Sequence, residues 1–184
     1  MKLEDESLEC NRQVLRRHCK DLHDTSEGIW FGSSRFSNLT GYLFFLRVLQ
    51  NAHVQYGLPA AQVIGEKSHI EVERRRLKAL ERDLHSKTKP AVEKVDISAD
   101  FAWGIGYVLN GSALGASTLL KSHAISRSWP RRYLKDGYTF AREGDLARFF
   151  RKLNDQRLDI QEAVDGAEAT FELFVSHQPE RALA

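Results

Sequence analysis

A histidine flanked by two cations is the part of this sequence with the clearest chemical potential. It is His23, in the segment LRRHCKDLHDTSE (residues 15–27). On one continuous helix, His23, Arg16 and Lys20 lie within about 60° of one another, beside an apolar stripe of Leu8, Leu15, Cys19 and Leu22. A neutral imidazole is a common iron ligand, and two cations beside it suit the paired carboxylates of a porphyrin. We therefore interpret His23 as a candidate iron ligand.

Two neighbours of His23 refine this interpretation. Glu27 follows His23 by one helical turn, so its carboxylate could orient the imidazole through a hydrogen bond or a water. His18 flanks the apolar stripe on the other side, away from the cations. The alternative is that His23 is a structural residue. We interpret the remaining histidines as structural or surface residues, namely His53, His69, His85, His123 and His177.

A second feature is the uncharged segment FAWGIGYVLNGSALGASTLL, residues 101–120, which contains four glycines. On a helix, Gly104, Val108, Gly111 and Gly115 fall within about 60° of one another and form a face that is poor in side chains. Each interior glycine costs a helix about 1 kcal/mol relative to alanine, although alanine packs nearly as closely. The glycines therefore favour a flat ligand lying on the backbone, and close helix packing is the alternative.

The same segment could also suggest a membrane span or a nucleotide-binding turn. Glycine and polar residues dilute its hydrophobicity, and no second apolar segment accompanies it, so we expect a buried helix instead of a membrane helix. A nucleotide-binding glycine turn follows a strand and opens a helix, whereas these glycines lie inside a predicted helix.

Helical periodicity in the rest of the chain predicts the elements that must position these residues. Apolar stripes recur over residues 39–56, 70–84, 146–153 and 160–174, with a helix cap near Ser98, and no strand pattern appears. Segments 24–37 and 123–142 are typical of irregular connections, the second with room for a short helix. The sequence predicts an all-α fold of six to eight helices in one bundle-like domain, residues 1–184.

Composition limits the function classes. Of the 184 residues, 42% are hydrophobic and 28% charged, as in soluble globular proteins, and the net charge of +2 gives no basic stripe for nucleic acid. Cys10 and Cys19 would lie too far apart on one helix for a disulfide. The acidic N-terminal segment MKLEDESLECNRQ is unlike a secretory signal. We therefore expect a cytoplasmic protein without nucleic-acid or membrane partners.

Several segments resemble one known family. LRRHCKDLHDTSE looks like the N-terminal helix of heme oxygenases, and GYVLNGSALGAS resembles the distal helix of their bacterial, biliverdin-producing, phytochrome-associated branch. Weaker similarity covers LTGYLFFLRVL, ALERDL and DGAEATFELF. The resemblance implies a single-domain heme oxygenase-like helical bundle, with His23 as the proximal iron ligand and Arg16 and Lys20 near the propionates. It also implies that Gly111 and Gly115 lie against the heme face.

The resemblance implies further roles and a reaction. Tyr107 on the distal helix and basic residues of a late helix would contact heme, the candidates there being Arg148, Arg151 and Lys152. Ser112 and Asn110 would serve proton delivery, because family acids are missing at these positions, and Ala116 replaces a glycine. Heme would be opened by O2 to biliverdin, CO and iron, with electrons from a ferredoxin or reductase and a phytochrome as biliverdin acceptor. Two alternatives stay open: a non-catalytic heme or tetrapyrrole carrier or sensor, and a helical protein without a cofactor.

Overall fold

Helices are the only regular structure among the residues that the computed structural model describes, which are 9–31, 34–87, 96–121 and 125–176. The all-α prediction is confirmed for these residues. The helices are α1 (Asn11–His18), α2 (Lys20–Trp30), α3 (Leu39–Ala52), α4 (Leu58–Ile64), α5 (Lys67–Leu84), α6 (Ala99–Lys121), α7 (Arg132–Arg142), α8 (Asp145–Asn154) and α9 (Ile160–Ser176), with a 3-10 turn η1 (Ser34–Ser37) and a π-helical turn η2 (His53–Gly57).

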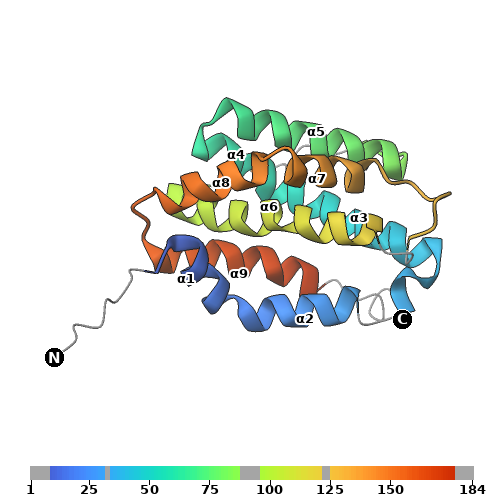
Figure 1. Cartoon of the computed structure of the whole chain (residues 1–184), viewed down its shortest axis with the longest axis horizontal. Coiled ribbons are helices and arrows are strands. Elements are labelled where there is room, and N and C mark those ends of the chain that lie inside the picture. Colours follow the sequence, from blue (N-terminus) through green and yellow to red (C-terminus); the bar gives the residue numbers. More distant parts are fainter. Residues whose placement is uncertain (1–8, 32–33, 88–95, 122–124, 177–184) are drawn as a thin grey trace.

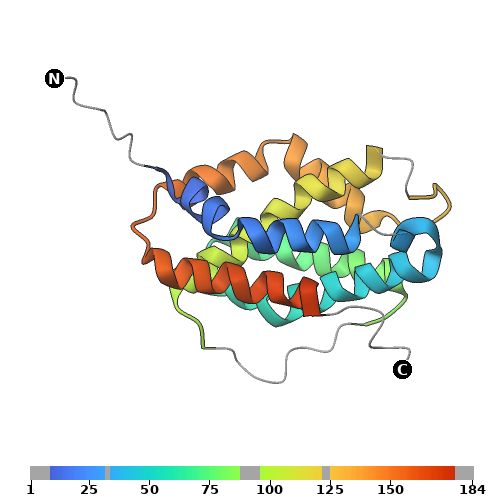
Figure 2. The same cartoon turned by 90° about the horizontal axis from the view of Figure 1, so that it is seen from below.

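Helix α6, the uncharged segment, runs through the middle of the bundle (Figure 1). It packs against α9 on one side and against α7, α4 and α8 on the others. Helix α2 lies along α9 (Figure 2), so α2 and α6 share α9 as a common support. The Ser98 hydroxyl accepts the Phe101 backbone N–H at 3.1 Å, which confirms the predicted cap of this helix.

The glycine face of α6 divides into two parts. At the crossing with α9, a Cβ atom on Gly104 would lie 1.8 Å from the carbonyl oxygen of Ala163, and one on Gly166 would lie 2.1 Å from that of Phe101. These two glycines let the backbones of α6 and α9 touch. Close packing, the alternative to a ligand, therefore explains Gly104, whereas Gly111 and Gly115 lie beyond this crossing.

A Gly104→Ala variant should lose about 3 kcal/mol of unfolding free energy, because its methyl group must push two backbones apart. Urea denaturation followed by circular dichroism measures this loss. Gly28→Ala is the matched control, since no described atom lies within 4 Å of a Cβ there, and it should stabilise α2 slightly. Equal stability of Gly104→Ala and the wild type would contradict this helix crossing.

The predicted first helix breaks at Cys19, whose φ and ψ of −89° and 10° end α1 and begin α2. Both parts pack on α9. Helix α1 also reaches α8, where the Asn11 side chain donates to the carbonyl of Leu153 in the last turn and to that of Gln156 just after the helix. Arg16 and His23 thus belong to different helices, so the single-helix angle between them does not hold.

Two predicted irregular segments also contain helices. Helix α2 continues to Trp30 because that indole is buried and donates to the Phe174 carbonyl at 3.1 Å, and α7 occupies residues 132–142. Likewise, Gly57 and Pro59 do not end the second helical region. The turn η2 leads directly into α4, where Pro59 occupies the first turn, a position at which a backbone N–H has no partner inside the helix.

None of the described helices combines the length and apolar character of a membrane span.

Candidate functional site

The C-terminal end of α2 approaches α6 through Phe31, the residue that follows the helix. His23, Glu27 and Phe31 are spaced by four residues and therefore share one helical face. The Phe31 ring lies 3.9 Å from the Cβ position of Gly115 on α6. At the other end of the face, the His23 ring meets Phe171 of α9 edge-on, with centroids 6.0 Å apart. We define the candidate site as His23 and Glu27 of α2, Phe31 directly after it, and Gly111 and Gly115 of α6.

The α6 side of the candidate site is open. Among the described residues, no atom lies within 4 Å of a Cβ built on Gly111. Apolar surface flanks this opening, since 44% of Phe31 and 49% of Leu114 are exposed. Large exposed apolar side chains close together often mark a binding surface. A flat apolar ligand on the backbone of Gly111 would cover both.

The His23 imidazole is available as a ligand. Its side chain is 53% exposed, with Nε2 3.7 Å from Glu27 Oε1 and Nδ1 3.7 Å from Asp24 Oδ1. Both distances exceed a hydrogen bond, so neither nitrogen is committed. When one nitrogen binds a metal, the N–H of the other can donate to the nearer carboxylate and fix the ring.

The two predicted cations are placed differently. Lys20 pairs with Asp24 at 2.6 Å on the protein surface, and this hydrogen bond raises the pKa of Lys20 and lowers that of Asp24. Exposed pairs of this kind contribute about 0–1 kcal/mol, so Lys20 can exchange Asp24 for a ligand carboxylate. Arg16 is exposed in the last turn of α1.

Tyr107 lies where α1 approaches α6. Burial raises the pKa of its hydroxyl, as does Cys19, while the charges of Arg12 and Arg16 lower it. The hydroxyl is therefore within the electrostatic reach of both guanidinium groups. The structure thus brings the predicted residues Arg16 and Tyr107 together at the α1 end of the candidate site.

The basic residues of α8 lie elsewhere. Arg148 pairs with Asp145 at 2.8 Å, and Lys152 pairs with Glu66 next to α5. On the side of α8 that faces α1, the Arg12 guanidinium lies over the ring of Phe150. Arg148 and Lys152 are each about 160° from Phe150 around the helix and so lie away from the α1 side of α8. Their predicted contact with heme stays a prediction. Arg151 is exposed.

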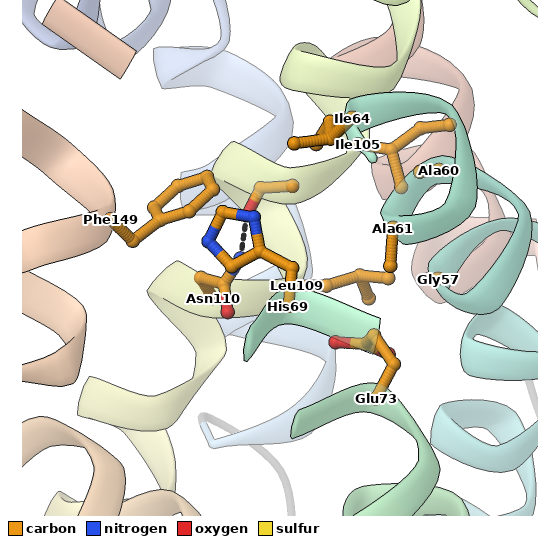
Figure 3. A pocket seen from close by; sticks show the side chains of 11 residues that line it. Gly57, Ala60, Ala61, Ile64, His69, Glu73, Ile105, Leu109, Asn110 and Phe149 are labelled. Carbon is orange, nitrogen blue, oxygen red and sulfur yellow. Dashed lines mark hydrogen bonds between the residues drawn. The ribbon is translucent and has the colours of Figure 1, made fainter. Parts of the chain in front are cut away.

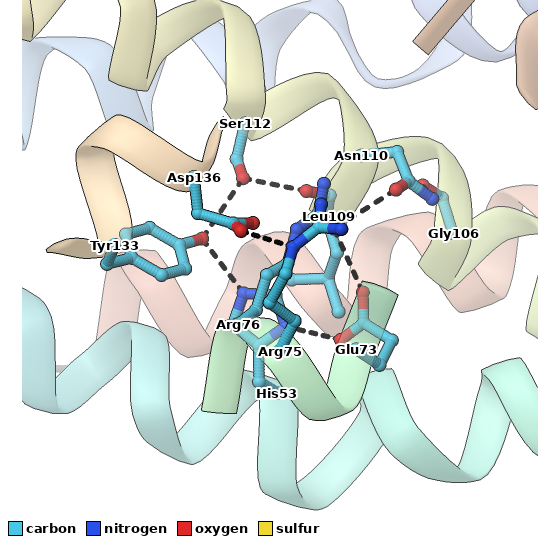
Figure 4. Close-up of polar contacts among 10 residues, drawn as sticks. All are labelled: His53, Glu73, Arg75, Arg76, Gly106, Leu109, Asn110, Ser112, Tyr133 and Asp136. Atoms are coloured by element: carbon cyan, nitrogen blue, oxygen red, sulfur yellow. Dashed lines mark hydrogen bonds and ion pairs between the residues drawn. The ribbon is translucent and has the colours of Figure 1, made fainter. Parts of the chain in front are cut away.

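Behind Gly111, its two neighbours join a buried hydrogen-bond network (Figure 4). On one side the Ser112 hydroxyl donates to the Leu109 carbonyl at 2.7 Å and lies 3.5 Å from the Tyr133 hydroxyl. That hydroxyl contacts His53 Nε2 at 2.8 Å. The opposite ring nitrogen, Nδ1, lies 2.6 Å from Glu73 Oε2. The network therefore leads from α6 through α7 and η2 to α5.

From Glu73 the network returns to α6. Glu73 Oε1 accepts from Arg76 at 2.9 Å, and Arg76 also donates to Asn110 Oδ1 at 3.0 Å. The Asn110 amide in turn donates to the Gly106 carbonyl at 3.0 Å. The network therefore begins and returns on α6, at Ser112 and Asn110, both of which are predicted site residues. It fixes α6 from behind while Gly111 stays open in front.

The charge states in the network follow from its environment. Burial alone would raise the pKa of Glu73, but His53 and Arg76 outweigh burial and hold it at about 2. Burial raises the pKa of Tyr133 to about 12, so its hydroxyl keeps its proton and donates to His53 Nε2. His53 Nδ1–H then donates to the ionised Glu73. The Tyr133 backbone N–H is held by Asp83 Oδ2 at 2.9 Å.

Replacing Glu73 with glutamine should cost about 3–5 kcal/mol of unfolding free energy at pH 7, because Arg76 stays buried without its partner charge. The folded pKa of about 2 lies below the ordinary value of 4.5. Ionised Glu73 therefore stabilises the fold above pH 4.5, and this contribution to the free energy of unfolding is lost as the pH falls toward 2. Urea denaturation between pH 7 and pH 2 should show that the difference in unfolding free energy between the wild type and the variant becomes smaller as the pH falls.

The exposed Glu71 on the same helix provides the control. Glu71→Gln should change stability by less than about 0.5 kcal/mol at every pH. A similarly small effect of Glu73→Gln would show that the buried ion pair does not stabilise this fold.

Four members of the network are not predicted as site residues by the sequence patterns: His53, interpreted as structural, and Glu73, Arg76 and Tyr133. A signal for two of them was present. Glu73 and Arg76 lie between Ile70 and Leu77 on the apolar face of residues 70–84. An amphipathic helix normally carries apolar side chains on this face, which is directed at the core. Charges on an apolar face indicate buried, paired groups.

Comparisons of the chain with protein-family models, with curated proteins and with solved structures returned no match.

Proposed function

We propose that this protein is a heme oxygenase, which binds heme between α2 and α6 and opens it with O2 and external electrons to biliverdin, CO and iron. The observation that supports this proposal most is the half-exposed His23, which shares one helical face with Phe31, whose ring approaches Gly115 of α6. In this proposal, the residues that the heme oxygenase resemblance names on two distant segments would line one site.

The residues of the candidate site suit the chemistry of a heme. His23 offers an uncommitted imidazole nitrogen, and Phe31 offers exposed apolar surface to a porphyrin ring. Arg16 and Lys20 can hold its two propionates by charge-assisted hydrogen bonds. When bound, the heme supplies the oxygen chemistry itself, with electrons from a ferredoxin or a reductase.

The chain's own residues would orient the ligand and move protons. Gly111 lets the backbone approach one face of the ligand, because no side chain intervenes. Ser112 is the network member beside that opening, and its hydroxyl can rotate from the Leu109 carbonyl to donate a proton toward the site. The Tyr133 hydroxyl, 3.5 Å away, could replace that proton only as a protonated His53 returns one to Tyr133 through Nε2. Glu73 would stabilise the imidazolium form of His53 that this relay needs.

A heme carrier or sensor is the second candidate. Three residues favour it, because each is already engaged inside the protein. Asn110 bonds Arg76 and Gly106, and Ser112 bonds Leu109. Ala116 is buried against α7, where a Cβ on Gly137 would lie 2.9 Å from its own. In this second candidate the distal helix is held rigid and offers no acid to bound oxygen.

A turnover experiment separates the two candidates. Purified protein is mixed with one equivalent of hemin under air and then given ascorbate or a ferredoxin system. A heme oxygenase will replace the Soret band by the spectrum of biliverdin. A stable protein-bound heme spectrum would instead support the carrier, and the unchanged spectrum of free hemin would contradict both.

A further inference from the structure

A small cavity, partly open to the outside, lies on the side of α6 that faces α4, α5 and α8 (Figure 3). Its volume is about 20 Å³, which is enough for one water molecule. Most of its wall is apolar, including Ile105, Leu109 and Phe149. The polar side chains that line it are His69, Glu73 and Asn110.

His69 has a buried nitrogen that the described residues leave unpaired. No hydrogen-bond partner is found for its Nδ1, and the nearest carboxylate, Glu66, is 4.0 Å away. The ring is held edge-on by Trp103 and Phe149, with centroids 6.1 Å and 5.1 Å apart. Since an unpaired buried polar group costs about 1–3 kcal/mol, this nitrogen calls for a partner.

His69 also borders a second, larger space. A groove of about 180 Å³ lies outside it between α5 and α8, and His69 and Phe149 line both the groove and the inner cavity. The groove carries charged side chains that include Arg148 and Lys152. The His69 imidazole therefore lines both a charged surface groove and a cavity that touches the buried network.

We propose that the inner cavity holds one ordered water bound to His69 Nδ1, and that His69 and this water form the route by which protons pass between the surface groove and the Glu73–Asn110 side of the network. The two groups beyond the water, the Glu73 carboxylate and the Asn110 amide, supply the further hydrogen bonds that a buried water needs.

The charge state of His69 suits this role. Burial lowers its pKa, as do Lys152 and Arg76, against the opposing effect of Glu66 and Glu73. At neutral pH the ring is therefore uncharged, with one nitrogen as acceptor and the other as donor, so it can accept from a water on one side and donate on the other. This route is independent of the proposed heme function, and it is tested on the protein without heme.

A crystal structure at high resolution tests the water directly. We expect one ordered water within hydrogen-bond distance of His69 Nδ1 and of Glu73 or Asn110. Electron density showing a dry cavity would overturn the proposal, whatever the outcome of any heme experiment.

Exchange at the buried His53 ring tests the route. In the wild type, proton NMR should show the His53 N–H exchanging with solvent at least about tenfold faster than in His69→Leu, which removes the nitrogen. His69→Asn places an amide near the position of Nδ1 and should keep exchange close to the wild-type rate. Equal exchange rates in the wild type and in His69→Leu, with both folded to the same melting temperature, would overturn the route.

Discussion

Replacing His23 with alanine will weaken hemin binding about 100-fold and shift the Soret band that the wild-type complex shows, because the variant lacks the imidazole that we expect to bind iron. The side chain is half-exposed and makes no hydrogen bond at ordinary distance. The variant should therefore unfold at nearly the wild-type temperature. Titration with hemin, followed by absorbance, measures both the affinity and the ligand change.

His18 gives the matched control for this variant. It is also an exposed histidine, five residues earlier, but it belongs to α1 and does not share the helical face of Glu27 and Phe31. His18→Ala should bind hemin like the wild type. Free imidazole should restore the Soret band of His23→Ala by occupying the place of the lost side chain. Equal affinities of His23→Ala and His18→Ala would exclude His23 as the iron ligand.

Gly111→Ala is expected to act on stability and on ligand binding in opposite directions. Because no described atom lies within 4 Å of the new methyl group, the substitution should stabilise α6 by about 1 kcal/mol through helix propensity alone. The same methyl group occupies the surface on which the heme would lie. Hemin affinity should therefore fall at least about tenfold, which corresponds to about 1.4 kcal/mol.

Gly28→Ala is the counterpart on α2, because it also adds a methyl group to an open, exposed helix position. Gly28 lies about 140° from His23 around the helix, so this variant should gain stability without losing hemin affinity. Urea denaturation and hemin titration on both variants make the comparison. If Gly111→Ala gained stability and kept full affinity, the open face of α6 would not be a heme contact.

The sequence could predict the candidate site because its key residues lie on local helical patterns. His23 and Glu27 are one turn apart on one helix, and Gly111 and Gly115 are one turn apart on another, so periodicity alone groups each pair. The role of Gly104 could not be separated from theirs in this way. Only the path of α9 decides that Gly104 meets a backbone while Gly111 meets none.

The buried network could not be predicted from local patterns. His53, Glu73, Arg76 and Tyr133 come from three different elements and meet only when α5 and α7 pack beside α6. The rotation of α8 was likewise undetermined, because its apolar stripe does not say whether Arg148 is nearer to α5 or to α1. Both the members of the network and the rotation of α8 depend on tertiary packing, which residue spacing along the chain does not determine.

The two sides of α6 have complementary roles in the proposed function. On the buried side, Asn110 and Ser112 tie the helix to a charged pair that resists movement. On the open side, the intervening Gly111 leaves the backbone accessible. A rigid helix with one exposed turn is suited to hold a flat ligand at a fixed distance and to present a hydroxyl group beside it.

A crystal structure of the one-to-one hemin complex tests the central claim most directly. We predict that the iron is bonded to the imidazole of His23, that the opposite face of the porphyrin lies against Gly111 and Gly115, and that the propionates point toward Arg16 and Lys20. A complex in which hemin lies elsewhere, or in which another side chain binds the iron, would contradict the account.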